Sequence, residues 1–378
     1  MEYFFFGVQT FFISKSIGYL LRIFIFSINE NTMNNEIFLI FFMGLNIIDW
    51  ISLLFTFLLQ FFLFKNGHYI TKTLINFSGS FVYFGLFLFL IIIISENYNS
   101  LLFRFLEIAS YENLFTKENL PPLIAVTGTM FAYFSIVILN FGDFSRYAKN
   151  EQELKKGNFT LIINVILFSF LALLIVFGAD IIINNDITTS ERLLTNPTDI
   201  IGKINNTYLT VIALLFILVA SLSTNLIANY VPSQNTLLNF LPKQLNLNTS
   251  GLLIIFLGLL ISSFWLPILS QIGILSFLDT LGAFFGPIFG LIIADYYFVK
   301  KSKIISKDIF SSKKDSQYLY SNGWNIKAIY SIIIGFIFSA STIWNPNLNF
   351  LQSFLWILGA VVTFFTYYLL ASVIKKNE

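Results

Sequence analysis

The sequence predicts an all-α polytopic membrane protein with about ten transmembrane helices. Hydrophobic residues make up 56% of the 378 residues, charged residues only 11%, and the mean hydropathy is +0.78. In water, such a composition would leave large apolar patches exposed. Because lipid offers the backbone no hydrogen-bonding partners, each spanning segment must be a helix.

Ten apolar runs have about the 20 residues that a bilayer core of roughly 30 Å requires. No soluble domain is inserted between them, so residues 1–378 are predicted to form a single transmembrane transporter domain. The connection 96–120 mixes apolar and charged residues at helical spacing, which favours a short surface helix. The ten runs lie near 3–26, 45–64, 74–95, 121–141, 158–184, 208–230, 251–270, 272–299, 327–344 and 350–374.

Lysine and arginine follow the predicted topology. If residue 1 is cytoplasmic, only Arg104, Lys117, Arg192 and Lys203 fall outside, and the other loop cations fall inside. Basic loops resist translocation. We therefore predict an integral protein of the plasma or inner membrane with both termini cytoplasmic.

The chain lacks the residues that several classes of chemistry require. Cysteine is absent, so disulfides and thiolate metal sites are excluded. The single histidine, His68, has no nucleophile and acid arranged around it, and no glycine-rich phosphate loop with lysine is present. A transporter driven by an ion gradient is left, and it needs no cofactor besides a coupling ion, Na⁺ or H⁺.

The fourth run ends in the patch NFGDFSRY, which places Asp143 and Arg146 at a membrane exit. A carboxylate and a guanidinium one turn apart can pair and can also bond neighbouring helix ends, as a moving boundary requires. The alternative is an interfacial anchor. Asp295 repeats this position at the inner end of the eighth run.

Two faces of the sixth run carry polar side chains. Ala220, Ser223 and Thr224 share one face, and their hard oxygen donors suit Na⁺. The adjacent face, Ser221, Asn225 and Asn229, can hold the donor and acceptor edge of a heterocycle. The alternative for both faces is bonding across helices or to the i−4 carbonyl.

The eighth run places Gly282, Gly286 and Gly290 four residues apart, with Pro287 between them. This pattern indicates close helix packing, and the proline adds the alternative of a gating hinge. In the fourth run, Thr127 and Gly128 suggest a helix interrupted before Phe134.

The first run carries Gln9, an amide that needs partners, with Phe5 one turn earlier on the same face. Such a pair suits a planar ligand, although packing is the more common reason for it. Lys15 in the same run is expected either to pair with a carboxylate such as Asp49 or to face a water-filled cavity.

Five ordered segments together resemble the nucleobase:cation symporter family, whose members carry cytosine, uracil, purines, allantoin and hydantoins. These segments are FFFGVQTF (4–11), LNFGDFSRYAKN (139–150), STNLIANYVPSQNTLLNFLPKQLN (223–246), FFGPIFGLIIADYYFVKK (284–301) and YSNGWNIKAI (320–329). They are similar to the family's WFGxQTW, LNxxDFxRYA, TN-x-x-AN-x-x-P, GP-x-x-G-x-x-x-ADY and GxN-x-x-A patterns.

The resemblance implies a leucine-transporter-like inverted-repeat fold that works by alternating access, as a monomer, on a nucleobase-like small molecule and not on nucleic acid. It assigns heterocycle hydrogen bonds to Gln9 and Asn229 and ring stacking to Phe5 and Phe134, where the family usually has Trp. It assigns the cation to Ala220, Ser223 and Thr224. Asp143, Arg146, Gly286, Pro287 and Asp295 then take structural or gating roles.

The resemblance also aligns the first run with the third of the family's twelve helices, so the first two are expected to be missing. The leading prediction is cation-coupled uptake of a heterocycle such as uracil, allantoin or cytosine. The alternative is a transport-inactive remnant or a ligand-sensing membrane protein of the same fold.

Overall fold

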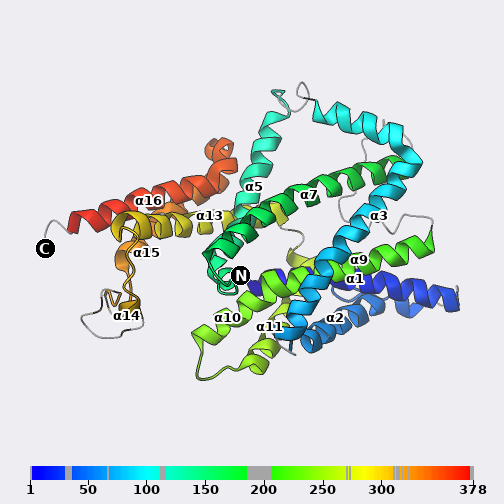
Figure 1. The fold of residues 1–378 in the computed structure, drawn as a ribbon, viewed down its shortest axis with the longest axis horizontal. Helices are drawn as coiled ribbons and strands as arrows, with labels where there is room; N and C mark the ends of the chain where they lie inside the picture. Colours follow the sequence, from blue (N-terminus) through cyan, green and yellow to red (C-terminus); the bar gives the residue numbers. More distant parts are fainter. Residues whose placement is uncertain are drawn as a thin grey trace. The chain divides into compact units, whose positions relative to one another are not determined.

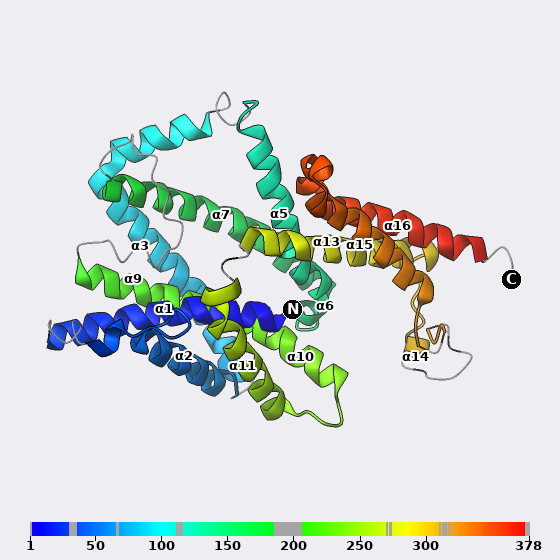
Figure 2. The ribbon, with the colours of Figure 1, turned by 180° about the vertical axis from the view of Figure 1, so that it is seen from behind.

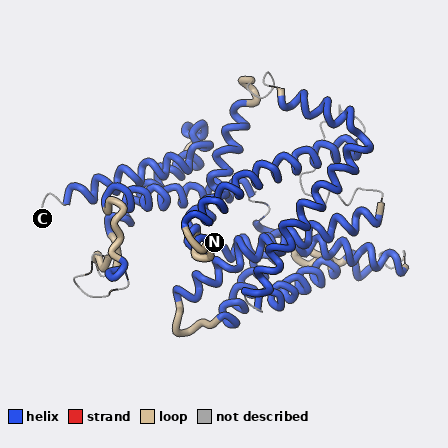
Figure 3. Tube along the Cα trace, in the orientation of Figure 1, coloured by secondary structure: helices blue, strands red, loops and turns tan. Residues whose placement is uncertain are grey.

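The computed structural model describes residues 2–29, 36–65, 68–110, 116–184, 206–269, 271, 274–309, 311, 316, 318–321 and 323–374. Within these ranges every regular element is a helix and none is a strand (Figure 3). The chain forms two compact units, each of which is described by itself. Unit 1 comprises residues 1–113 and 143–271, and unit 2 comprises residues 114–142 and 272–378.

Unit 1 is built around its first helix. α1 (Glu2–Ile28) packs against α2, α9 and α11, and Figures 1 and 2 show it lying alongside these helices from opposite sides. The other elements of unit 1 are the 3₁₀ turn η2 (Glu36–Leu39), α2 (Ile47–Lys65), α3 (His68–Ala109), α7 (Glu151–Asn184), α9 (Thr207–Asn225), the π-helical η3 (Leu226–Tyr230), α10 (Val231–Phe240), α11 (Leu247–Ser263) and the π-helical η4 (Trp265–Leu269).

The core of unit 1 lies between these helices. Phe6 and Phe11 of α1 are almost fully buried against Leu53 of α2, Leu226 of η3 and Ile254 of α11. Many other phenylalanines are exposed, as expected of helices that face lipid. The sequence therefore buries one apolar face of each helix and leaves the rest for the bilayer.

Unit 2 is organised around α13 (Ile274–Ile293), which packs against three other helices of the unit, α5, α15 and α16. The other elements are α5 (Leu120–Leu139), the π-helical η5 (Ala294–Val299), α14 (Ser306–Ile309), α15 (Ile326–Trp344), the 3₁₀ helix η6 (Pro346–Phe354) and α16 (Leu355–Ile374). The short α6 (Phe141–Ser145) lies where the chain passes between units.

Small residues make the packing of α13 possible. A Cβ at Gly286 would meet the carbonyl of Trp356, and one at Gly290 would meet that of Ala360. α13 continues without a break through Pro287, whose ring packs against Gly359 of α16. The structure therefore favours the packing interpretation of this glycine series over the hinge.

Nine helices in the described residues are long and apolar enough to span a membrane, and α11 is a shorter apolar helix of 17 residues. The seventh expected span, 251–270, is thus divided: α11 ends at Ser263 and η4 follows. The remaining nine expected runs each correspond to one of the nine long helices, with boundaries shifted by several residues in places.

Two further expectations about the helices were wrong. α5 is not interrupted at Thr127 and Gly128 but runs unbroken from Leu120 to Leu139. Thr127 bonds the Leu123 carbonyl at 2.8 Å, and Gly128 makes room for the Ser353 carbonyl, so both residues serve a continuous helix. Residues 96–109, expected as a separate surface helix, are the continuation of α3.

Candidate functional site

Two amides predicted for ligand binding meet in unit 1. Asn229 Nδ2 donates to Gln9 Oε1 over 2.8 Å, and Gln9 Nε2 donates to the Ser221 carbonyl at 3.3 Å. Asn229 is 7% exposed, and Gln9 is half-buried. Asn229 lies in η3, a π-helical turn between α9 and α10, and such turns are frequent at functional sites.

Behind these amides lies a buried network that joins three helices. Thr10 of α1, Gln60 of α2 and Asn225 of α9 are each fully buried. Asn225 Nδ2 donates to Thr10 Oγ1 at 3.0 Å and to Gln60 Oε1 at 2.9 Å. Sequence analysis placed Asn225 beside Asn229 but missed Thr10 and Gln60, because bonds across 50 residues or more leave no local pattern.

The three residues predicted for the cation also lie together on α9. Ser223 Oγ donates to the Ala220 carbonyl at 2.8 Å, and Thr224 Oγ1 donates to the same oxygen at 3.0 Å. Ser223 is buried and Thr224 is exposed. The hydroxyl hydrogens thus point back to the helix, which leaves the lone pairs of two oxygens for a cation.

The two predicted stacking rings belong to different units. Phe5 on α1 in unit 1 is half-buried and meets the Phe4 ring edge-on, with centroids 5.7 Å apart. Phe134 on α5 in unit 2 is 41% exposed and meets Tyr133 edge-on at 5.2 Å. Within their own units, both rings keep surface that a planar ligand could cover.

Asp143 is the centre of the membrane-exit patch. Its Oδ1 accepts from Arg146 Nη2 at 2.5 Å and from Asn235 Nδ2 of α10 at 3.0 Å. The Asp143 side chain is only 14% exposed, whereas that of Arg146 is 47% exposed. The patch is therefore tied to α10 as well as paired within itself.

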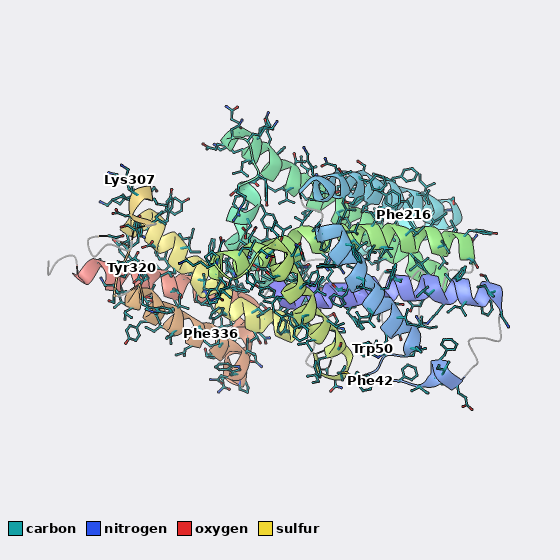
Figure 4. The ribbon with its side chains drawn as sticks, turned by 90° about the horizontal axis from the view of Figure 1, so that it is seen from below. Phe42, Trp50, Phe216, Lys307, Tyr320 and Phe336 are labelled. Atoms are coloured by element: carbon teal, nitrogen blue, oxygen red, sulfur yellow. The ribbon has the colours of Figure 1, made fainter. Side chains whose placement is uncertain are left out.

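Asp295 forms a second polar cluster in unit 2. It pairs with Lys300 at 2.7 Å and accepts from the Tyr367 hydroxyl at 2.7 Å. Lys300 also donates to Tyr320 at 3.1 Å (Figure 4 labels Tyr320). Burial lowers the pKa of the Lys300 ammonium, but hydrogen bonds to Asp295 and Tyr320 outweigh it, so the pKa is raised overall.

One acidic residue of unit 2 escaped sequence analysis. Asp279, in the first part of α13, accepts from Gln352 Nε2 at 2.9 Å and from Thr129 Oγ1 at 3.4 Å. An acid inside a predicted span is itself a signal, because charge is costly there. The run 272–299 was interpreted through its glycines, and its first acid was passed over.

A family model matches residues 1–369, nearly the whole chain, and its description is "Permease for cytosine/purines, uracil, thiamine, allantoin". The chain belongs to this permease family. The family assignment inferred from the five motifs is thereby confirmed, and the family is one of transporters rather than enzymes. With its long apolar helices, the chain is an integral membrane protein.

Curated relatives of this chain include the purine-uracil permease NCS1 of Arabidopsis thaliana. It is 30% identical over 206 residues, which cover 54% of this chain and 33% of the relative. The allantoin permease of Bacillus subtilis (strain 168) is 26% identical over 260 residues, which cover 68% of this chain and 51% of the relative. The chain thus matches about half or less of the length of these relatives.

Solved structures establish the fold of this chain. Mhp1, a nucleobase-cation-symport-1 family transporter in a closed conformation with bromovinylhydantoin bound, matches with a TM-score of 0.69. The match covers 100% of this chain and 74% of Mhp1 at 16% identity. The inward-facing conformation of Mhp1 gives a TM-score of 0.65. The expected leucine-transporter-like fold is confirmed.

Proposed function

We propose that this permease is a secondary active transporter that couples uptake of a nucleobase or related heterocycle, such as uracil, allantoin or cytosine, to Na⁺ or H⁺. The observation that carries the proposal is the contact between Gln9 and Asn229. Two neighbouring amides in a largely apolar unit offer a donor and an acceptor to one edge of a planar ring. The relatives are named for purine, uracil and allantoin transport, which supports this ligand class.

The remaining predicted residues take roles around this pair. Phe5, which lies in the same unit as this pair, would stack on the ring, with less area than Trp and without an indole N–H. Ala220, Ser223 and Thr224 would contribute oxygens to Na⁺ on the same helix that leads to Asn229. Asp143, Arg146, Gly286, Pro287 and Asp295 would hold the helix ends and packing seams that move during alternating access.

The proposal includes a setting for the transporter. The plasma or inner membrane, with both termini cytoplasmic, follows from the excess of basic residues in the inner loops. A monomer is the expected working unit. No cofactor besides the coupling ion enters the proposed cycle.

Uptake into proteoliposomes tests the proposal. Radiolabelled uracil, allantoin and cytosine are offered under an inward Na⁺ gradient, an inward H⁺ gradient or neither. We expect one substrate to accumulate under one gradient, and Asn229→Leu to abolish that accumulation. Asn164→Leu on α7 is the matched control, because the Asn164 side chain donates to the Thr160 carbonyl of its own helix.

Three results would change the conclusion. Saturable binding without gradient-dependent uptake would favour the ligand-sensing alternative of the same fold. No binding of any of the three heterocycles would contradict the proposed ligand class. Equal losses in Asn229→Leu and Asn164→Leu would remove Asn229 from the binding site.

A further inference from the structure

The hydrogen bonds of the buried network in unit 1 have a fixed donor and acceptor at each step, and the first acceptor is a backbone carbonyl. Thr10 Oγ1 donates its only hydrogen to the Phe6 carbonyl at 2.7 Å. A carbonyl can only accept, so the Thr10 oxygen is left as an acceptor. Two amide nitrogens donate to it, Asn225 Nδ2 at 3.0 Å and Gln60 Nε2 at 3.1 Å. The 3.5 Å approach of Thr10 Oγ1 to Gln60 Oε1 is the longest of the set and competes for the same hydrogen.

The acceptor role of the Thr10 oxygen fixes the orientation of the Asn225 amide. An amide orientation is settled by its partners. Asn225 Nδ2 donates to Thr10 and to Gln60 Oε1, which lies 2.9 Å away, and the Phe6 carbonyl is a longer third acceptor at 3.4 Å. Its nitrogen therefore faces the core of the network, and its Oδ1 faces outward. Turning this amide over would set its oxygen against the Gln60 oxygen and its N–H groups against those of Asn229.

The orientation of Asn225 in turn determines which atoms of Asn229 and Gln9 are left for a ligand. Asn229 Nδ2 donates to Asn225 Oδ1 at 2.8 Å and to Gln9 Oε1 at 2.8 Å, which uses both of its hydrogens. Asn229 can offer a ligand only its oxygen. Gln9 Oε1 already accepts from Asn229, and Gln9 Nε2 keeps one hydrogen beyond the long bond to the Ser221 carbonyl, so Gln9 can donate to a ligand.

We propose that Thr10 and Asn225 are positioning residues that fix the hydrogen-bond polarity of the binding site, so that Asn229 accepts from the ligand and Gln9 donates to it. This inference rests on the proposed function. It defines the substrate class as planar heterocycles that carry an N–H donor directly beside a C=O acceptor. Lactam and imide edges, such as those of uracil, hydantoin and allantoin, have this arrangement.

The polarity has a consequence for selectivity. A ligand whose edge nitrogens are methylated gives Asn229 Oδ1 no hydrogen and leaves this largely buried acceptor unpaired. Sites built to bond a substrate N–H or O–H reject analogues that lack it far more strongly than sites that only exclude a methylene. 1,3-Dimethyluracil keeps the ring and both carbonyls of uracil but has no N–H, so it offers Asn229 Oδ1 no hydrogen.

Thr10→Val tests the proposal because it keeps the shape of the side chain and removes the hydroxyl at the start of the network. Thr56→Val is the matched control: Thr56 is also fully buried and bonds an i−4 carbonyl, that of Ser52, at 2.6 Å, but no amide of the network. Thr10→Ser restores the hydroxyl. The readouts are equilibrium binding of uracil and of 1,3-dimethyluracil to the purified chain.

We expect Thr10→Val to weaken uracil binding by about tenfold or more, as loss of a buried hydrogen-bond partner does. The preference for uracil over 1,3-dimethyluracil should fall in the same variant. Thr10→Ser and Thr56→Val should stay within about twofold of the parent, since both leave the network intact. Unchanged uracil binding in Thr10→Val, an equal loss in Thr56→Val, or a failure of Thr10→Ser to restore binding would overturn the proposal.

A second measurement needs no ligand and separates the two claims. If the parent chain binds neither compound, the proposed function and the assigned substrate class both fail. The positioning role of Thr10 and Asn225 is then tested by a double-mutant cycle of unfolding midpoints. It combines Thr10→Val with Asn229→Ala, two sites joined through Asn225. Non-additive Tm losses show that Thr10 and Asn229 are coupled through Asn225, and additive losses overturn the positioning role.

Discussion

Arg22 of α1 pairs with Asp49 in the first turn of α2, with Nη2 of the guanidinium 2.6 Å from Oδ1 of the carboxylate. The same nitrogen reaches Asn46 Oδ1 at 3.3 Å. Asp49 Oδ2 also accepts from the Asn46 backbone N–H at 3.2 Å. The alternative expectation that Asp49 pairs with Lys15 was wrong. Lys15 instead lies over the Phe11 ring, 5.5 Å from its centroid.

The fork of the Arg22 guanidinium explains this choice of partner. A planar group with several donors can bond the carboxylate and the neighbouring amide oxygen together, whereas an ammonium acts as a point charge. Next to this pair, Trp50 Nε1 donates to the Phe42 carbonyl at 3.2 Å, and Figure 4 labels both residues. The turn before α2 is therefore fixed from two sides.

Replacing Arg22 with Met should destabilise unit 1 by about 1–3 kcal/mol, because it leaves a mostly buried carboxylate without its charged partner. The measurement is the midpoint of thermal unfolding in detergent. Lys155→Met is the control, since the Lys155–Glu151 pair is 74% and 78% exposed and surface pairs contribute little. Equal shifts in both variants would contradict the assigned role of Arg22.

The glycine seam of α13 predicts opposite effects for two identical substitutions. Gly286→Ala should destabilise unit 2 by about 1–3 kcal/mol, because its Cβ would meet the Trp356 carbonyl and helix backbones adjust poorly. Gly79→Ala in α3 meets nothing within 4 Å, so it should be neutral or stabilise by about 0.5–1 kcal/mol. The Tm of thermal unfolding, measured for both variants, tests this prediction. A hinge at Gly286 without tight packing would instead leave the Tm of Gly286→Ala unchanged.

Asn235→Leu should loosen the membrane-exit patch without unfolding unit 1. The variant removes the amide that bonds Asp143 from α10 and leaves the Asp143–Arg146 pair in place. We expect faster hydrogen–deuterium exchange of residues 141–149, since their cross-helix tie is lost. Asn239→Leu, four residues later on α10, is the control. Exchange that is unchanged in Asn235→Leu would show that the pair alone holds the patch.

The Lys300 cluster predicts a stability difference with a defined pH dependence. The folded-state pKa of Lys300 is raised above its ordinary value of 10.5, so the cluster stabilises the folded state fully below that value. The contribution is lost as the pH rises through the folded-state pKa. The difference in unfolding midpoint between parent and Lys300→Met should therefore be constant from pH 7 to 9 and shrink above about pH 10.5.

Tyr320→Phe serves as the control for this titration, because it removes the hydroxyl that accepts from Lys300 while Lys300 keeps Asp295. The shrinkage should persist in this variant. A difference between parent and Lys300→Met that stays constant to pH 12 would mean that the ammonium contributes by its packing over the Tyr318 ring and not by its charge.

The sequence by itself determined the class of this protein, nine of its long helices and its family. Composition and the length of apolar runs act locally, and the bilayer forces any such run into a helix. The five motifs are contiguous, so Gln9 and Asn229 could be named from their neighbours in the chain. The two amides lie 2.8 Å apart because α1 packs against η3.

Only the tertiary structure decided which polar groups bond across helices. Thr10, Gln60 and Asn225 meet across 50, 165 and 215 residues, and no local pattern specifies such partners. The π-helical turn at Leu226–Tyr230, the Arg22–Asp49 pair and the unbroken α5 were decided in the same way. The physical reason is that a buried polar group must find whichever partner the packing of its helix brings within reach, and packing is a property of several helices at once.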